Sequence, residues 1–199
     1  MARSVSITKN ESQIVSTSEA KTHLRVSTSA DDDYIQNLIF AATEQIEKYI
    51  NCVILEAACV QWCDTWTDTL ELYYSPLINS RSLTVTHIKY YDDNDTLQTW
   101  DAANYVVDNV HTPARIGIKA NLDYPTVSER IAPIIITYTS GYSSVSQVPA
   151  DIKQAILIMV GQWYENRQVA VVGRSVGTIP MTAEYLIEKY KARTFGLPC

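Results

Sequence analysis

Cysteine and histidine are scarce in this sequence, with four cysteines and three histidines among 199 residues. Cys59 and Cys63 are four positions apart in a segment typical of a strand, so they would share one face but lie too far apart to bind one metal ion without a turn. No second pair of cysteines or histidines lies near them in the sequence. We therefore expect no zinc centre and no cofactor, and a chain of this length needs no disulfide to bury a stable core.

Long apolar runs are also missing. No segment approaches the roughly 18 consecutive apolar residues of a membrane-spanning helix. The first residues, MARSVSITKNESQ, lack the apolar stretch of a secretory signal. We therefore expect a protein that is made in the cytoplasm and does not associate with a membrane.

Basic residues are outnumbered, because 16 lysines and arginines face 22 acidic residues and leave a formal net charge of −6. Non-specific affinity for nucleic acid comes from neutralising phosphates, so this balance argues against broad DNA binding. The acidic excess is central: residues 51–140 hold 5 basic and 11 acidic side chains, whereas residues 141–199 hold 6 and 4. The mildly basic C-terminal part would suit an acidic partner surface, although a solvated face is the simpler interpretation.

Catalytic motifs are missing too. His23, His87 and His111 fall in a predicted helix, strand and loop, and none lies near a nucleophile motif such as GxSxG. The run GRSVG at 173–177 has no lysine of a phosphate-binding loop and does not follow a strand. An enzyme is therefore the most distant of the function classes that we consider.

Two binding functions are also disfavoured. A DNA-binding regulator would need a basic recognition helix, whereas the predicted helix at 150–167 carries only Lys153 and Arg167 as basic residues. The acidic run at 92–95 resembles the start of a calcium loop but lacks its glycine and closing glutamate, so a hairpin turn explains it better. The four tryptophans and thirteen tyrosines have no interleaved lysines and arginines, which favours packing on a sheet face or at an interface over base stacking.

The N-terminal quarter predicts two helices. Ser16 followed by Glu19 fits a capping box and predicts a short helix that ends near Arg25. The acidic residues at 31–33 favour the start of a second helix, and Asn51 suits its left-handed end. Its buried stripe has helical spacing and comprises Ile35, Leu38, Ile39, Ala42, Ile46, Tyr49 and Ile50. Its outward face comprises Gln36, Glu44, Gln45, Glu47 and Lys48.

The middle of the chain changes to the pattern of strands, with Thr, Val, Tyr and Trp in short runs between polar clusters. The clearest hairpin pairs 83–91 with 96–100 across the acidic turn at 92–95. Pro133 cannot donate to a ladder, so its strand is an edge there or begins just after it. We expect an antiparallel meander.

The helical pattern returns after Pro149, with a predicted helix at 150–167. Five consecutive apolar residues at 156–160 cover every side of that helix, so we expect it to be buried all round, as the central core element or as one shared with a subunit contact. A Val/Gly loop follows at 168–180. Thr182 is the expected cap of a last helix that reaches Lys191. Its apolar positions are Tyr185, Leu186 and Tyr190.

The predicted fold class is therefore α+β, with an antiparallel β-rich region inserted into a helical core. We expect a single domain over 1–199, with the helical core at 16–51 and 149–192 and the insertion at 56–140. Residues 193–199 form a C-terminal tail.

The two helical blocks together resemble a known family. The first reads EAKTHLRV and then DDDYIQNLIFAATEQIEKYIN, and the second reads TSGYSSVSQVPADIKQAILIMVGQWYENR before a Val/Gly loop. The order of these motifs resembles the head-to-tail connector proteins, also called adaptor or head completion proteins, of tailed bacteriophages. The resemblance spans nearly the whole chain, and it departs from the family pattern at Asn51, where relatives often have glycine.

The resemblance implies a structural protein of the virion. Such adaptors form a ring, expected to be dodecameric, below the portal, where the ring extends the DNA channel and provides an attachment surface for the tail. The implied partners are the portal protein, a tail or nozzle/stopper protein and further copies of the chain, while genomic DNA passes through without specific binding during packaging and ejection. The implied location is the head–tail interface. The alternative is another structural capsid or tail-completion protein with a similar helical core.

The resemblance also suggests three regions for partner binding. The candidates for binding the portal lie in the basic C-terminal helix and tail and are Lys189, Lys191, Arg193, Phe195 and Leu197. The candidates for a subunit or tail interface are Gln36, Glu44, Glu47, Val171, Val172 and Arg174. The candidate acids of the channel or rim are Asp92, Asp93 and Asp95. No catalytic, cofactor-binding or metal-binding residue is expected.

Overall fold

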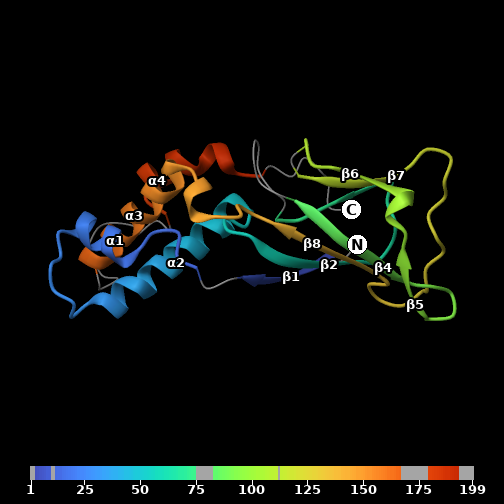
Figure 1. Cartoon of the computed structure of the whole chain (residues 1–199), viewed down its shortest axis with the longest axis horizontal. Coiled ribbons are helices and arrows are strands. Elements are labelled where there is room, and N and C mark those ends of the chain that lie inside the picture. The colour runs from blue at the N-terminus through green and yellow to red at the C-terminus, as the bar shows by residue number, and fades with distance from the viewer. Residues whose placement is uncertain (1–2, 10–11, 75–82, 112, 167–178, 193–199) are drawn as a thin grey trace, which may run out of the picture. The chain divides into compact units, whose positions relative to one another are not determined.

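The computed structural model describes residues 3–9, 12–74, 83–111, 113–166 and 179–192. It confirms the α+β class, with helices and antiparallel sheets (Figure 1). The chain divides into two compact units. Of the described residues, the helical unit contains 12–51, 144–166 and 179–191, and the sheet unit contains 3–9, 52–74, 83–111, 113–143 and 192. Each unit is described by itself below.

The two N-terminal helices follow their local signals. Helix α1 (Thr17–Leu24) begins after Ser16, whose hydroxyl accepts from the Glu19 N–H at 3.2 Å, while the Glu19 carboxylate accepts from the Ser16 N–H at 2.8 Å. This confirms the capping box. Helix α2 (Asp32–Ile50) ends at Asn51, which has a left-handed φ of 54°, as predicted. The buried positions of α2 include the predicted residues Ile35, Ile39, Ala42, Ile46 and Ile50.

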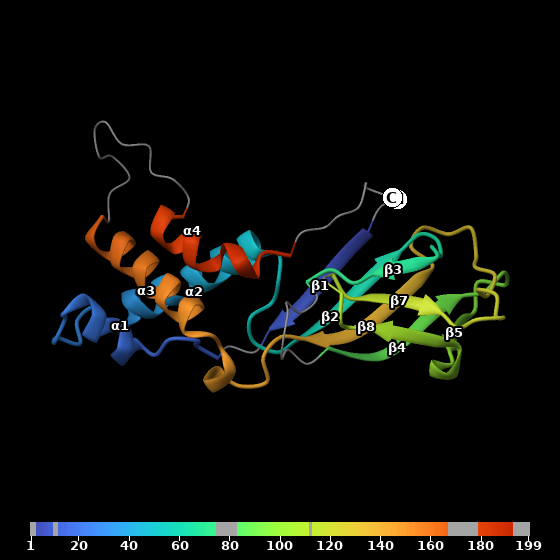
Figure 2. The same ribbon diagram turned by 90° about the horizontal axis from the view of Figure 1, so that it is seen from above.

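Helix α3 (Ala150–Glu165) is the centre of the helical unit, because it packs against α1, α2 and α4 (Figure 2). Its buried residues are Ile152, Ala155, Ile156, Met159 and Val160. Leu157 and Ile158 are only half-buried, so the prediction that this helix is buried all round is wrong for those two positions. His23 of α1 packs beside Gly161, where a Cβ would lie 3.5 Å from its Nε2 atom, an ordinary van der Waals contact.

Helix α4 (Met181–Ile187) differs from the prediction at its start. Thr182 lies inside the helix, because the backbone of Pro180 is extended, at φ −58° and ψ 138°, and the helix begins directly after it. The buried side chains are Ala183 and Ile187, four residues apart on one face. A short 3-10 helix, η3 (Glu188–Tyr190), completes the segment that was predicted to reach Lys191.

The main sheet has five antiparallel strands in the order β1-β2-β8-β4-β5. Their bounds are β1 Arg3–Lys9, β2 Ala57–Cys63, β8 Ile134–Ser140, β4 Thr84–Tyr91 and β5 Leu97–Trp100. Strands β2 and β8 alternate regularly between buried and partly exposed residues, so one face of this sheet packs on the core. The predicted hairpin of β4 and β5 is confirmed. Strand β8 begins just after Pro133, which confirms the second of the two predicted alternatives, a strand that starts after the proline instead of an edge strand that contains it.

A smaller sheet has the order β3-β7-β6, with β3 at Thr69–Glu71, β7 at Arg115–Ile118 and β6 at Tyr105–Asp108. The 3-10 helix η1 (Ala102–Asn104) precedes β6. Leu70 and Ile116 of this sheet share one buried cluster with Ile88 and Ile136 of the larger sheet. The two sheets therefore enclose a common core (Figure 2).

The prediction of a meander is wrong. Strand β8 lies between β2 and β4, so the last strand of the unit separates strands that precede it in the sequence. Strand β1 was not predicted, although Ser4, Val5, Ser6 and Ile7 alternate as a half-buried strand does. Pairing between residues far apart in the sequence leaves no local signal, which explains why the order of the strands was not predicted.

Aromatic side chains fill the core of the sheet unit. Packing on a sheet face was one of the two roles predicted for them, the other being an interface. The Trp66 ring stacks on Tyr124, with centroids 5.2 Å apart, and lies 4.8 Å from the Trp100 ring. Trp100 in turn contacts Tyr105 at 5.3 Å. The indole N–H of Trp66 donates to the carbonyl of Pro125 at 2.8 Å, so its polar atom is satisfied while its ring is packed.

A buried glutamine connects the segment after β3 to the main sheet. The side chain of Gln61 is fully buried, and its Nε2 donates to the Glu71 carbonyl at 2.9 Å. Its Oε1 accepts from the Tyr73 N–H at 3.0 Å, and the Tyr138 hydroxyl donates to the Tyr73 carbonyl. Buried polar groups of this kind stabilise a fold only when they are paired, and these are.

Gly141, just after β8, provides a test of the fold. It has a φ of 116°, and a Cβ there would lie 2.5 Å from both the C and O atoms of Leu55. We expect Gly141→Ala to lower the free energy of unfolding by about 2 kcal/mol or more, because alanine combines a disfavoured φ with a clash against backbone. Urea denaturation of the full chain measures this change. Gly117→Ala in β7 is the matched control, since nothing lies within 4 Å of its Cβ position, and an equal loss in both variants would contradict the prediction.

Candidate functional site

The acidic turn between β4 and β5 is stabilised by hydrogen bonds to the carboxylate of Asp92. Asp92 accepts from the backbone N–H groups of Asn94 and Thr96, both at 3.0 Å, and from the side-chain amide of Gln98 at 2.8 Å. These donors, Thr96 first, hold the pKa of Asp92 below its usual range. Asp92 therefore has a structural role in the predicted hairpin turn.

The other two predicted rim acids also have partners on the loop that precedes β8. Asp93 accepts from the Thr126 hydroxyl at 2.9 Å, and Asp95 forms an ion pair with Arg130 at 3.1 Å. Asp95 has a left-handed φ of 56°, which aspartate tolerates in turns. Its carboxylate is still 62% exposed. The three acids thus stand together at one end of the sheet unit.

The predicted interface on α2 is only partly available. Gln36 and Glu44 are exposed. Glu47 was expected to face outward, and this is wrong, because only 5% of its surface is exposed. It follows Ile46 directly and precedes Ile50 by three residues, so it lies at the border of the buried stripe, where neighbouring parts of the fold cover it.

Two of the predicted portal-binding residues hold the C-terminal helices in place. Lys189 forms an ion pair with Asp151 of α3 at 2.5 Å, and its own side chain remains 61% exposed. Lys191 lies over the ring of Tyr49, 4.1 Å from its centroid. The remaining candidates of this group, Arg193, Phe195 and Leu197, lie outside the described residues, as do Val171, Val172 and Arg174 of the second group.

Tyr49 of α2 is also the hydrogen-bonding partner of α4. Its hydroxyl lies 2.7 Å from the Glu184 carboxylate and 2.6 Å from the Glu188 carboxylate. These acceptors, Glu188 first, raise the pKa of the Tyr49 phenol. The Tyr49 side chain therefore ties the last two helical segments to the long second helix.

An apolar surface on α4 was missed by the sequence analysis. Met181 is 85% exposed and Tyr185 is 84% exposed, and their separation of four residues places them on one face of the helix. Large apolar side chains this exposed are typical of contact surfaces when they occur together. Tyr185 was among the predicted apolar positions of this helix, but the sequence alone did not show that it lies on the exposed face.

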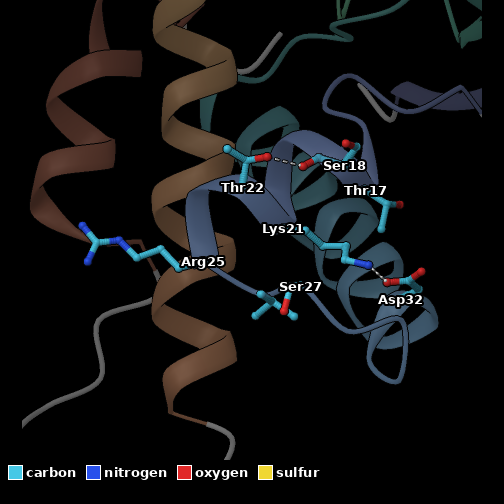
Figure 3. A pocket seen from close by; sticks show the side chains of 8 residues that line it. Thr17, Ser18, Lys21, Thr22, Arg25, Ser27 and Asp32 are labelled. Atoms are coloured by element: carbon cyan, nitrogen blue, oxygen red, sulfur yellow. Dashed lines mark hydrogen bonds and ion pairs between the residues drawn. The ribbon is translucent and has the colours of Figure 1, made fainter.

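An open pocket of about 390 Å³ lies beside α1 in the helical unit (Figure 3). It is lined by Thr17, Ser18, Lys21, Thr22, Arg25, Val26, Ser27 and Asp32. Lys21 points to Asp32 and binds it at 2.6 Å, whereas Arg25 extends away from them. The two basic groups do not converge, so the pocket is not arranged to bind an anion.

The sequence candidates for chemistry are dispersed in the structure. His23 packs beside Gly161, and His87 lies in β4. Cys59 and Cys63 are buried on one face of β2, as the strand pattern predicted. Within the described parts of the chain, no three metal-binding side chains come together. Among these same residues, no helix is both long and apolar enough to cross a membrane.

A charged cluster closes the turn between β6 and β7. Asp108 accepts from Arg115 Nε at 2.9 Å, lies 2.7 Å from His111 Nδ1 and accepts from the Val110 N–H at 3.1 Å. The Arg115 hydrogen bond is the main reason that the pKa of Asp108 falls from 3.8 to about 2.

This cluster predicts a pH dependence of stability. Because the folded carboxyl releases its proton at a lower pH than the unfolded one, its stabilising contribution is present above about pH 4 and is lost as the pH falls toward about 2. We expect Asp108→Asn to flatten the decline of the urea midpoint over that range. Asp123→Asn is the control at an exposed aspartate, and identical pH profiles for wild type and Asp108→Asn would refute the assignment.

Taken together, the described side chains connect helices and strands to one another, and the surfaces left over are apolar or charged patches suited to protein contacts. The chain belongs to the head completion protein family, whose model matches residues 13–191. Its role is therefore structural, as a head–tail connector of the virion.

Solved structures show the same fold. A chain from the neck of an empty gene transfer agent particle, computed with C6 symmetry, has a TM-score of 0.74 and 19% identity over 98% of both chains. A chain from the virion of a native gene transfer agent particle has a TM-score of 0.72 and 21% identity, covering 94% of this chain and 93% of that one. A chain from the neck of the native particle, computed with C12 symmetry, has a TM-score of 0.69 and 20% identity, covering 92% and 91%. No curated protein sequence matches the chain.

Proposed function

We propose that the protein forms a closed ring at the neck of a tailed particle, where it joins the portal to the tail and continues the DNA channel. The observation that carries the proposal is the head completion family match over residues 13–191. The fold likeness to neck chains whose reconstructions used C6 and C12 symmetry supports a ring, with dodecameric symmetry as the expected form.

A closed ring needs a heterologous interface, in which two different surfaces of one chain meet on neighbouring copies. The exposed pair Met181 and Tyr185 is the strongest candidate for one of these surfaces. The half-buried residues Leu157 and Ile158 of α3 support the earlier alternative that this helix is shared between the core and a subunit contact. Gln36 and Glu44 remain candidates for the opposite surface, as do Val171, Val172 and Arg174.

The acidic charge suits a conduit for DNA. A lumen that carries negative charge repels phosphates, so DNA slides through it without specific binding. The net charge of −6 supports this role. Asp92, Asp93 and Asp95 are candidates for the lumen or for its rim, and because hydrogen bonds hold all three in fixed positions, their charge would be presented at a defined place.

The mass of the purified chain tests the proposal, measured by native mass spectrometry with and without the purified portal ring. We expect a complex in which many copies of the chain join one portal, because a ring adaptor must match the portal around a common axis. Assembly only on the portal and assembly in its absence would both support a ring. A chain that stays monomeric and never joins the portal would exclude it.

The C-terminal residues are the proposed portal contact, since they combine basic and apolar side chains, which suit an interface with a partner of complementary charge. We expect a triple variant, Arg193→Ser, Phe195→Ser and Leu197→Ser, to lose portal attachment in the same mass measurement while its thermal unfolding is unchanged. The matched control changes Thr194→Ala and Pro198→Ala in the same segment. Full attachment of the triple variant would contradict this prediction and would mean that other residues bind the portal.

A further inference from the structure

Ile131 is the most exposed large apolar residue described in the sheet unit, with 87% of its surface accessible. It lies in the loop between β7 and β8, which passes beside β5 and the acidic turn in Figure 1 (yellow to gold). Single exposed apolar residues are common on protein surfaces and need no explanation by themselves. The setting of this one is unusual, because the chain on both sides of it is tied down.

The residues around Ile131 are held on the β4–β5 hairpin by several independent contacts. The guanidinium of Arg130 lies over the Tyr91 ring, 3.7 Å from its centroid, and pairs with Asp95 at 3.1 Å. The Ser128 N–H donates to the Tyr91 carbonyl at 2.9 Å, and the Tyr91 N–H donates to the Pro133 carbonyl at 3.0 Å. The loop is thus fixed before and after the exposed isoleucine.

The residue that follows Ile131 is in a disfavoured conformation. Ala132 has a φ of 53°, and its N–H donates to the Asp64 carboxylate at 3.2 Å. Residues without a glycine's freedom pay conformational energy in this region, and such positions cluster at functional sites. The fold therefore maintains an unfavourable backbone conformation at Ala132, directly after the isoleucine that is exposed to solvent.

The surroundings of Ile131 are acidic. Asp93 and Glu129 are exposed, and Asp95 keeps most of its carboxylate in solvent although it pairs with Arg130. Leu97 of β5, which pairs with Tyr91 in the ladder, adds a second apolar residue that is 43% exposed. We call this surface the acidic tip, and it comprises Asp93, Asp95, Leu97, Glu129 and Ile131.

We propose that the acidic tip docks the tail-side protein of the neck by inserting Ile131 into an apolar pocket whose rim is basic. A phosphate-bearing partner is disfavoured because the acids would repel it, which leaves a protein surface of complementary charge. A rigid anchor loses little conformational entropy on binding. A small number of such anchor residues usually provides most of the binding energy of an interface. This inference rests on the proposed function, which assigns the portal to the C-terminal residues and leaves the tail side for another surface.

The test compares two substitutions in the full chain assembled on its portal. The probe is the purified tail-side neck protein of the same particle, and its affinity is measured by biolayer interferometry. We expect Ile131→Ser to weaken binding by about tenfold or more, because it removes the central anchor. Val110→Ser is the matched control, since Val110 is 85% exposed in the β6–β7 turn of the same unit, and its affinity should equal that of the wild type.

The charge of the partner is tested separately. We expect wild-type binding to weaken as salt is raised and Glu129→Lys to weaken it further at low salt, whereas Asp123→Lys outside the tip leaves it unchanged. Wild-type affinity in Ile131→Ser would overturn the proposal, as would a loss confined to portal attachment or to self-association. A wild-type chain that never joins the portal would instead contradict the proposed function, so the two failures are distinguishable. A wild type that joins the portal but not the tail-side protein would overturn the acidic tip alone.

Discussion

The sheet unit depends on one close backbone contact, where the chain that enters it meets the chain that leaves it. The Tyr142 N–H donates to the Ile54 carbonyl at 2.8 Å, and the Glu56 N–H donates to the Tyr142 carbonyl at 2.9 Å. Gly141 makes this approach possible, because no side chain fits between it and Leu55. The contact closes the loop of chain from Cys52 to Ser143 and sets β2 beside β8 in register. The other strands of the larger sheet lie on either side of this pair, with β1 beside β2 and with β4 and then β5 beyond β8.

The rigidity of the outer parts follows from what is built on that pair. Gln61 of β2 satisfies the backbone groups after β3, and Trp66 and Trp100 fill the space between the two sheets. The β4–β5 hairpin extends from the same sheet, and its acidic turn holds the loop before β8 through Asp93 and Asp95. Asp93 and Asp95, which were predicted only as acids of the channel or rim, therefore also hold a loop of their own chain in place. An assembly protein benefits from such a framework, because surfaces that are already ordered lose little entropy when a partner binds.

In the helical unit, too, charged side chains that were predicted to bind a partner contact other parts of their own chain. Lys189 and Lys191 were candidates for a partner, and both contact other helices of their own chain, with Asp151 and Tyr49. Met181 and Tyr185 carry the exposed apolar area on the last helix. A protein of the head completion family needs contacts on several sides, and the charged residues here orient the elements while apolar residues remain exposed between them.

Local signals in the sequence determined a large part of this protein. The capping box at Ser16, the left-handed end at Asn51 and the hairpin turn at 92–95 each depend on residues within a few positions, so they were predicted from spacing alone. Tertiary structure decided what depends on distant neighbours. It placed β8 between β2 and β4, paired β1 with β2, covered Glu47 and left Tyr185 in solvent. Which face of an element is buried, and which surface is left for a partner, depends on packing between segments far apart in the chain, and no local pattern records it.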